Sequence, residues 1–411
     1  MRISSFVLFL AVLFFFGCDK GSGSRHTSAG NPGSGNTPDP DDETGVVLRS
    51  DPLPFLEGTI YLGNYNSHDG LYSLDVYDPE SGEIAPFVEF EVEGVSQPYG
   101  LGNFSFSPDG RFFSYVPSFY DRSLPDNRQR TDTYIIVVDL IDGVDVINIP
   151  INRSTNGWYE LLWTEDSRFL IFSVYGQTIF SLEISSGSLS VLVATNTPFR
   201  TYDHMASVSP SGEYLVLGHH EFGSLIDLYV SSRNPETGTI SATRLLRHME
   251  TQAHDENLGV QFFNETEFVF RWTKDAGPFA PRSPLYTISR GDAEAGEVFD
   301  LFDVRAEGTF HLTLSPRKDL ILYRSGDAIF SAEVGIWQPQ ERVRFSEELC
   351  GHVRITPWSP QGGYFIAEHL QLRGCDRPLG ESEELFLFEV DDFTAWPLSL
   401  DPALYDHLVW R

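Results

Sequence analysis

The feature that most constrains the fold of this chain is a short repeated pattern of two apolar segments joined by a tight polar turn. Its first complete copy is FSFSPDGRFFSYV, residues 104–116. Apolar and polar residues alternate on both sides of Ser-Pro-Asp-Gly, as expected for two half-buried strands that a turn connects. Further copies begin near residues 161, 206, 260, 312 and 355. Their turns lie 44 to 57 residues apart, a spacing that fits one four-stranded propeller blade.

A second series of segments recurs with the same period. Seven short apolar segments each end in a polar turn, and they begin near residues 71, 134, 179, 226, 285, 329 and 385. We interpret them as third strands, which leaves one copy without a complete first and second strand. The missing strands are GTIYLGNY from residue 58 and YDHLVWR at residues 405–411. The sequence therefore predicts an all-β, seven-bladed β-propeller of four-stranded antiparallel blades over residues 55–411, with the ring closed by strands from both termini.

The Ser-Pro-Asp-Gly turn is predicted to be part of the architecture rather than a catalytic site. Pro108 and Gly110 are typical turn residues, whereas other copies carry Glu165-Asp166 or Asn264-Glu265 at the turn. A catalytic or metal site would not allow that exchange. One slot on the innermost strands is occupied by tryptophan in three copies, which predicts packing between blades: Trp163, Trp358 and Trp410.

The repeats that contain Ser-Pro-Asp-Gly resemble the WD40-like (PD40) repeats of the TolB-type propeller family. The resemblance covers almost all of residues 55–411. TolB itself has six blades and a separate α/β domain that has no counterpart in this sequence. The resemblance thus implies the fold. The partnership of TolB with a peptidoglycan-associated lipoprotein is not carried over to this chain.

The amino-terminal residues have the features of an export signal. A basic start, Met1-Arg2, precedes an apolar run at 6–16 and the pair Gly17-Cys18. Eleven apolar residues are too few to span a bilayer as a helix, but they suit a signal peptide. A small residue before cysteine resembles the bacterial lipobox, which implies a signal peptide at 1–17 and lipidation of Cys18. The alternative is a plain signal peptide in which the cysteine is incidental.

Residues 18–54 are rich in Gly, Ser, Pro and Asp, and they predict a flexible tether. We therefore expect an exported bacterial lipoprotein on the periplasmic side of the inner or outer membrane, or at the cell surface. The net charge of −31 argues against nucleic acid and anionic lipid as partners. Membrane contact is then expected only through the lipid anchor, and the protein is expected to be a monomer.

The histidines are concentrated on one predicted side of the ring. We call this side the loop face, because it carries the connections between blades and those between second and third strands; the opposite side, with the repeated turns, is the turn face. All ten histidines outside the tether fall on the loop face or at strand ends beside it. They are His68, His204, His219, His220, His248, His254, His311, His352, His369 and His407.

The register of the repeats selects candidate binding residues at the channel mouth. The position three residues before the end of each innermost strand is occupied by Asn103, Glu160, Met205, Val260, His311, Ile355 and His407. On the second strands, His219 and His369 share a slot beside Glu221 and Glu368. The predicted ligand-binding residues are His311, His407, Glu160, Asn103, His219 and His369. Imidazoles with carboxylates suit a divalent metal, for which His311, His407 and Glu160 are the candidates. The structural alternative is that these histidines satisfy backbone groups at strand ends.

Two classes of function remain open. The sequence has no GxSxG or HExxH motif, so no catalytic residue is assigned. The favoured hypothesis is a binding or scaffold module for a protein, peptide or glycan on the loop face, without a cofactor. The alternative is a metal-dependent lyase or hydrolase with its site at the channel mouth. Oligogalacturonate lyase, a seven-bladed relative with a histidine-bound metal on one face, is the precedent by fold.

Cys350 and Cys375 are predicted to form a disulfide, because both fall in loops of one blade on the loop face. The alternatives are a metal-binding thiol pair and two inert buried cysteines. Closing a loop of about 25 residues should stabilise the fold by about 3 kcal/mol. Thiol titration of the unreduced, denatured protein is expected to find neither thiol free. Two titratable thiols from this pair would contradict the disulfide.

Cys18→Ser is expected to leave the protein unprocessed or to release it from the membrane, because the acceptor of the lipid is lost. The measurement is membrane fractionation with metabolic labelling by a radioactive fatty acid. A variant that still fractionates with membranes after removal of the signal would overturn the lipoprotein hypothesis.

Overall fold

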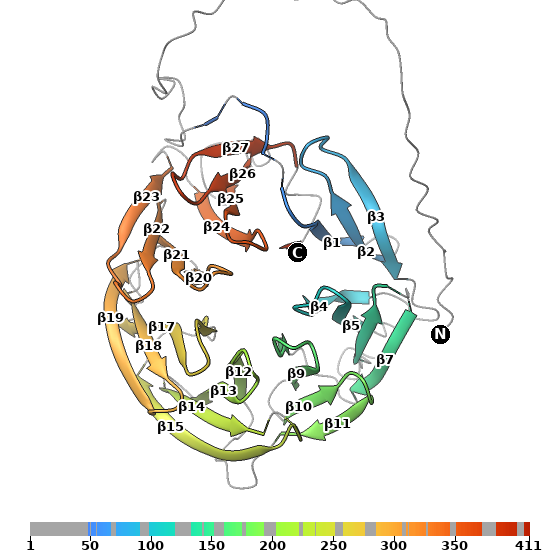
Figure 1. Cartoon of the computed structure of the whole chain (residues 1–411), viewed down its shortest axis with the longest axis vertical. Coiled ribbons are helices and arrows are strands. Elements are labelled where there is room, and N and C mark those ends of the chain that lie inside the picture. Colours follow the sequence, from blue (N-terminus) through green and yellow to red (C-terminus); the bar gives the residue numbers. More distant parts are fainter. Residues whose placement is uncertain are drawn as a thin grey trace, which may run out of the picture.

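The structure, a computed structural model, confirms the predicted propeller. Seven four-stranded antiparallel sheets surround a central axis (Figure 1). The described residues are 48–49, 51–54, 56–66, 71–90, 98–119, 133–141, 144–151, 160–174, 178–192, 203–221, 225–234, 236–250, 258–275, 285–305, 310, 312–325, 328–345, 351–371, 384–400 and 407–411. They are all strands, turns and irregular segments. In this part of the chain, no helix has the length and apolar character needed to cross a membrane.

Each blade has four strands, which are named from the innermost to the outermost. Blade 1 contains β28 (His407–Trp410), β1 (Ile60–Asn66), β2 (Leu71–Tyr77) and β3 (Ile84–Phe90). Blade 2 contains β4 (Pro98–Phe106), β5 (Phe112–Phe119), β6 (Thr133–Asp139) and β7 (Val144–Ile151). Blade 3 contains β8 (Glu160–Trp163), β9 (Phe169–Val174), β10 (Thr178–Glu183) and β11 (Ser188–Val191).

Blade 4 contains β12 (Asp203–Val208), β13 (Tyr214–Glu221), β14 (Leu225–Arg233) and β15 (Ile240–Glu250). Blade 5 contains β16 (Gln261–Phe262), β17 (Glu267–Asp275), β18 (Leu285–Asp292) and β19 (Glu297–Arg305). Blade 6 contains β20 (Leu312–Leu314), β21 (Leu320–Ser325), β22 (Ala328–Glu333) and β23 (Gln340–Arg344). Blade 7 contains β24 (Gly351–Trp358), β25 (Tyr364–Gln371), β26 (Glu384–Glu389) and β27 (Ala395–Leu398).

The ring is closed in blade 1 by strands from both ends of the chain, as predicted. β28 pairs with β1 from Ile60 opposite Trp410 to Gly63 opposite His407. The Arg411 amide adds a hydrogen bond of 2.8 Å to the carbonyl of Thr59. The first strand of the propeller is therefore the second strand of its blade, and the innermost strand comes from the last residues.

The hydrophobic core lies between the blades. The described residues form seven apolar clusters, and each joins two neighbouring blades. In the cluster that closes the ring, Ile366 and Leu387 of blade 7 pack with Trp410 of blade 1. Trp163 and Trp358 also contact the preceding blade, through indole hydrogen bonds of 3.1 Å to Ser114 and 3.0 Å to Thr313. The prediction that the three tryptophans pack between blades is confirmed.

The repeated turn has one hydrogen-bonding pattern in five blades. In blade 2 the Ser107 amide donates to the Phe112 carbonyl (2.9 Å), and the Phe112 amide donates to Ser107 Oγ (2.8 Å). Thr164, Ser209, Ser315 and Ser359 make the same pair of bonds with the fifth residue onward. The fourth residue of each turn has a positive φ, between 57° and 74°. Three copies have glycine there, and the other two have Ser167 and Lys318.

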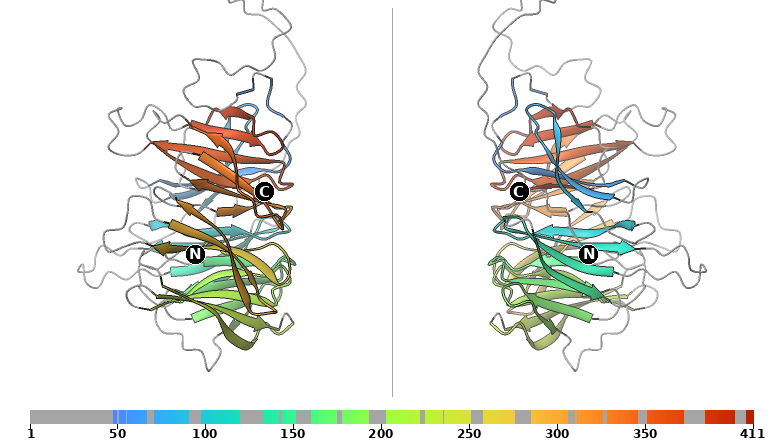
Figure 2. Two further views of the ribbon diagram at one scale, coloured as in Figure 1. Left: turned by 90° about the vertical axis from the view of Figure 1, so that its left-hand side faces the viewer. Right: turned by 90° about the vertical axis from the view of Figure 1, so that its right-hand side faces the viewer.

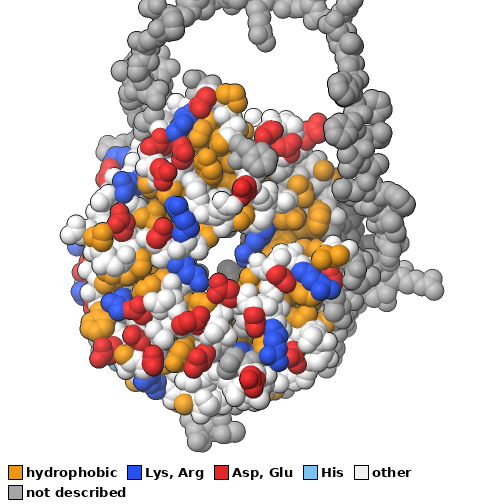
Figure 3. Space-filling model, in the orientation of Figure 1, with side chains coloured by type: hydrophobic (Ala, Val, Ile, Leu, Met, Phe, Trp, Pro, Cys, Tyr) orange, Lys and Arg blue, Asp and Glu red, His pale blue; other side chains and the backbone are white. Residues whose placement is uncertain are grey.

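The turns also bind one another on the turn face. The Asp109 amide donates to Ser167 Oγ of the next blade (3.0 Å), and the Glu165 amide donates to the Pro210 carbonyl (3.1 Å). Across the mouth, Lys318 Nζ of blade 6 lies 3.7 Å from Glu165 Oε1 of blade 3. The side views place the C-terminus on this side of the disc (Figure 2). The space-filling view looks onto it and shows a central hollow with Lys and Arg side chains at its rim (Figure 3).

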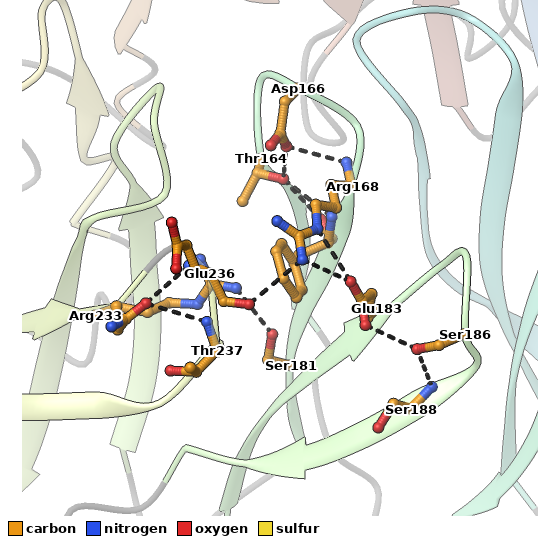
Figure 4. A network of polar contacts seen from close by, with 12 residues as sticks. Thr164, Asp166, Arg168, Ser181, Glu183, Ser186, Ser188, Arg233, Glu236 and Thr237 are labelled. Carbon is orange, nitrogen blue, oxygen red and sulfur yellow. Dashed lines mark hydrogen bonds and ion pairs between the residues drawn. The ribbon is translucent and has the colours of Figure 1, made fainter.

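A buried arginine links blades 3 and 4 beneath these turns (Figure 4). Arg233 is 2% exposed and lies 4.2 Å above the ring of Phe169. Its guanidinium donates to the Gly212 carbonyl (3.1 Å) and to Ser181 Oγ (3.3 Å). Burial lowers the pKa of Arg233 to about 10, so the side chain stays charged at neutral pH. Arg233 of blade 4 thus makes a cation–π contact and one hydrogen bond across the interface to blade 3, and one hydrogen bond within its own blade.

The segment that precedes β1 is held against the outer edge of blade 7. Leu48 forms a parallel bridge with Ala395, and the Arg49 amide donates to the Ala395 carbonyl (2.8 Å). The Arg49 guanidinium contacts Glu389 (2.5 Å) and Asp392 (2.7 Å). These bonds occupy part of the edge of β27, which otherwise is the outermost strand of its blade (Figure 1).

The turn geometry predicts a graded response to alanine at two of its glycines. Gly110→Ala should cost about 1 kcal/mol, because φ is +71° and a Cβ meets no atom within 4 Å. Gly212→Ala should cost clearly more, because φ is +74° and the Cβ would lie 2.6 Å from Thr164 Cγ2. Urea unfolding of both variants measures the difference. Equal losses would mean that the Thr164 side chain can move away from the added methyl group at little cost.

Candidate functional site

Three of the predicted site residues lie on innermost strands, and two of them are the first residues of their strands, remote from the turns. Glu160 is the first residue of β8 and pairs with Ser173. His407 is the first residue of β28 and pairs with Gly63. Asn103 lies in β4, where the register with β5 shifts between Gly102 and Phe104. The backbone therefore places Glu160 and His407 at strand ends remote from the turns, whereas Asn103 lies inside β4, three residues before its last residue, Phe106.

The other predicted residues divide into two groups. His219 lies in β13 opposite Asp203, and His369 lies in β25 opposite Val353, so both are also near the loop face. His311, the disulfide pair Cys350 and Cys375, and the lipidation residue Cys18 lie outside the described residues. The disulfide and the lipidation of Cys18 stay predictions.

Strand alternation distributes the innermost candidates over different blade interfaces. Leu162 of β8 packs in the cluster shared with blade 4. Glu160 lies two residues earlier, on the same side of the strand. Val409 packs in the cluster shared with blade 2, and His407 precedes it by two residues. Glu160 is thus placed at the interface of blades 3 and 4, whereas His407 is placed at the interface of blades 1 and 2.

A row of acidic and histidine residues crosses all four strands of blade 4 near the loop face. Asp203 of β12 lies opposite His219 of β13. His219 lies opposite Asp227 of β14, and Asp227 lies opposite His248 of β15. Residues that pair directly across antiparallel strands lie on the same face of a sheet. The order along this row is Asp203, His219, Asp227 and His248, from the channel to the outer edge.

The outer half of the row is a close hydrogen-bonded group. His248 Nδ1 lies 2.5 Å from Asp227 Oδ1, and the Tyr229 hydroxyl lies 3.2 Å from Asp227 Oδ2. The His248 side chain is 50% exposed, whereas the Asp227 side chain is 15% exposed. At this distance the His248 ring and the Asp227 carboxylate interact directly. Asp227 therefore orients an accessible imidazole.

The described side chains of this row, Asp227 and His248, lie on the side of the sheet toward blade 3. Tyr229 lies two residues after Asp227 on the same side of β14, and it packs with Ile171 and Ile179 of blade 3. Glu160 is placed on the opposing side of the same interface. The structure thus brings two predicted site residues, Glu160 and His219, to one interface, and it adds Asp227 and His248 there.

The sequence places His248 among the loop-face histidines, but it does not single out His248 or Asp227 as a site residue. The signal was present in the segments LIDLYV and LLRHME of consecutive strands. The sequence does not predict which of these residues pair, however, because the register of β14 with β15 shifts twice, at Leu228/Tyr229 and at Ser232/Arg233. Each shift changes which residue lies opposite Asp227.

Charged residues are also buried at one slot of the second strands in blades 5, 6 and 7. The slot lies three residues after Phe268, Ile321 and Phe365, which pair with the innermost strands beside the turns. Its occupants are 2 to 4% exposed and are Arg271, Arg324 and Glu368. The Arg271 guanidinium lies 5.5 Å from the ring centres of both Tyr286 and Phe310. Buried charges are rare unless they are compensated, so a charged residue at the same slot in three neighbouring blades distinguishes this slot from the apolar core around it.

No group of three or more His, Cys, Asp or Glu side chains that could hold a metal occurs among the side chains that the structure describes. Those side chains include Asp227 and His248, whereas the side chains of Glu160, Asp203, His219 and His407 lie outside that set. The metal candidates His311, His407 and Glu160 therefore stay a prediction.

Comparison with known proteins supports the fold. No protein-family model matches the chain, and no curated protein does. Among solved structures, prolyl oligopeptidase B from Galerina marginata, bound to a 35-residue hydrolysis and macrocyclization substrate, has a TM-score of 0.54 at 14% identity. The alignment covers 84% of this chain and 51% of that enzyme. At this identity the similarity shows the fold alone.

Two further structures match less well. Oligogalacturonate lyase in complex with manganese has a TM-score of 0.49 at 11% identity, over 83% of this chain and 85% of the lyase. TolB from Acinetobacter baumannii has a TM-score of 0.41 at 12% identity, over 71% of this chain and 64% of TolB. TolB is thus among the structural neighbours, while the PD40 repeat family remains a prediction from the turns.

Proposed function

We propose that this protein is a membrane-tethered, extracytoplasmic binding module whose loop face takes a protein, peptide or glycan ligand. In this proposal Cys18 carries the lipid, and the propeller works as a monomer on the outer side of a bacterial membrane. The binding residues are Glu160, His219 and the other loop-face candidates, namely Asn103, His311, His369 and His407.

The observation that carries the proposal is the different use of polar groups on the two faces. On the turn face, serine hydroxyls and turn amides bind one another within and between blades, as with Asp109 and Ser167. At the loop-face ends of the strands, histidine and acidic residues recur, and they take no part in the hydrogen bonds of the repeated turn. Binding residues typically lie at one end of a rigid scaffold, and here that end is the loop face.

The segment before β1 agrees with this proposal. Leu48 and Arg49 lie along the outer edge of β27, so the chain reaches the propeller at its rim. A tether that attaches at the rim leaves the mouth of the channel accessible to a ligand. The metal-dependent lyase or hydrolase remains the alternative, and it differs from the binding module in requiring turnover of the ligand.

Replacing two loop-face histidines should weaken ligand binding without destabilising the fold. We expect the double variant His311→Ala/His407→Ala to bind at least tenfold more weakly than the unmodified protein, since each imidazole would lose a ligand contact worth about 1 kcal/mol. A panel of defined oligosaccharides and peptides identifies the ligand, and calorimetry measures the dissociation constant. Arg317→Ala is the matched control, because this side chain is exposed on the turn face beside Asp319.

Binding that is lost with Arg317→Ala and kept by the double variant would contradict the proposal. A large fall in the melting temperature of the double variant would support the structural alternative, in which these histidines hold strand ends. Chemical change in a bound oligosaccharide would favour the lyase or hydrolase.

A further inference from the structure

We propose that His219, Asp227 and His248 bind one divalent first-row transition-metal ion on the side of blade 4 that faces blade 3. This site is distinct from the predicted set His311, His407 and Glu160 at the channel mouth. The inference does not depend on the proposed binding function, because the site is defined within one sheet.

The register brings the three residues into line on neighbouring strands. His219 and Asp227 lie directly opposite each other, and so do Asp227 and His248. Directly opposite residues have Cβ atoms about 4.5–5.5 Å apart, so the backbone places one histidine on each side of Asp227.

The described half of this arrangement already has the required proximity. His248 Nδ1 and Asp227 Oδ1 are 2.5 Å apart. Ligand atoms with bonds of about 2.0–2.2 Å to one ion lie about 3 Å from each other, so a small rotation of either side chain opens a place for the metal. His248 is half exposed, which gives the ion a path from solvent.

The donor set selects the kind of ion. Two imidazole nitrogens and one carboxylate oxygen suit Mn, Fe, Co or Zn as divalent ions, whereas Ca and Mg prefer oxygen ligands alone. Three protein ligands leave coordination positions open. The open positions would face blade 3, where the backbone places Glu160.

Neighbouring residues are arranged as such a site needs them. The Tyr229 hydroxyl lies 3.2 Å from Asp227 Oδ2, the carboxylate oxygen that does not contact His248. Asp203 lies opposite His219 on the innermost strand, so the backbone places a second aspartate beside that histidine. Hydrogen bonds of this kind orient metal ligands and raise their basicity.

A purely structural role would make different demands. The His248–Asp227 pair alone could stabilise the pairing of β14 with β15, as cross-strand pairs of opposite charge do. That role needs neither His219 nor Asp203. Replacement of His219 therefore separates the two explanations.

The test uses the full mature chain without a histidine tag, treated with EDTA and then titrated with Zn²⁺, Mn²⁺ or Co²⁺ alone. Calorimetry and elemental analysis are expected to find one tightly bound ion per chain at this site. His219→Ala, Asp227→Asn and His248→Ala should each weaken binding at least 100-fold, and Tyr229→Phe about tenfold, the range typical of residues that support a ligand.

The chain offers a matched control on the same strand. His220 follows His219 in β13 and pairs with Ile226, which packs toward blade 5. His220 thus lies on the opposite side of the sheet, and His220→Ala should leave the affinity unchanged. The metal should raise the melting temperature of the unmodified protein and of His220→Ala, but not that of His219→Ala.

Two results would overturn the proposal. The first is that the unmodified protein binds none of the three metal ions. The second is an affinity that does not depend on the proposed ligands: it falls equally in His220→Ala and His219→Ala, or it is unchanged in His248→Ala. Because His248 is half exposed, its variant should fold, and its melting temperature without metal verifies that.

Discussion

Residues 407–410 pair with residues 60–63, and the remaining structure depends on that closure. Each blade buries apolar side chains on both of its sides, so it needs a neighbour on each side. An open ring would expose Ile366 and Leu387 of blade 7 together with the edge of β1. The pairing of β28 with β1 covers both at once, and Trp410 fills the space between blades 7 and 1. The chain thus satisfies the general requirement that sheet edges and apolar faces be covered.

The same closure explains why the two faces differ. The turns meet at the narrow inner edge of the ring, where neighbouring turns are close enough to exchange hydrogen bonds. Asp109 and Ser167 do so, as do Ser211 and Glu265. Ser167 and Lys318 accept a left-handed backbone conformation that favours glycine, and the side chains of both reach another turn. The turn face is therefore used to hold the ring together, which leaves the loop face for variable chemistry.

Blade 4 shows how a repeated fold can acquire a local site. Its strands keep the shared architecture, and the row from Asp203 to His248 occupies one level of the sheet near the loop face. The apolar contacts of Tyr229 fix the neighbouring part of β14 against blade 3, so the side chain of Asp227, two residues earlier, is held on the same side of the strand. A site built on paired strands is more rigid than one built on loops. The packing of the interface and the placement of polar groups are thus produced by the same alternation.

The sequence by itself determined the architecture: the period of the turns, the alternation on both sides of FSFSPDGRFFSYV and the unpaired segments at the two ends predicted seven blades and their closure. These are local properties, because alternation and turn chemistry depend on residues that are near in sequence. The sequence also placed Glu160, His219 and His407 near one face, since that follows from strand direction. Only the tertiary structure decided which of them share an interface between blades. Glu160 and His407 proved to belong to different interfaces, and Asp227 joined His248 only through a register with two shifts between β14 and β15. A slip of one residue turns every side chain of a strand to the other face, so the identity of a cross-strand neighbour depends on bulges and packing that no short segment encodes.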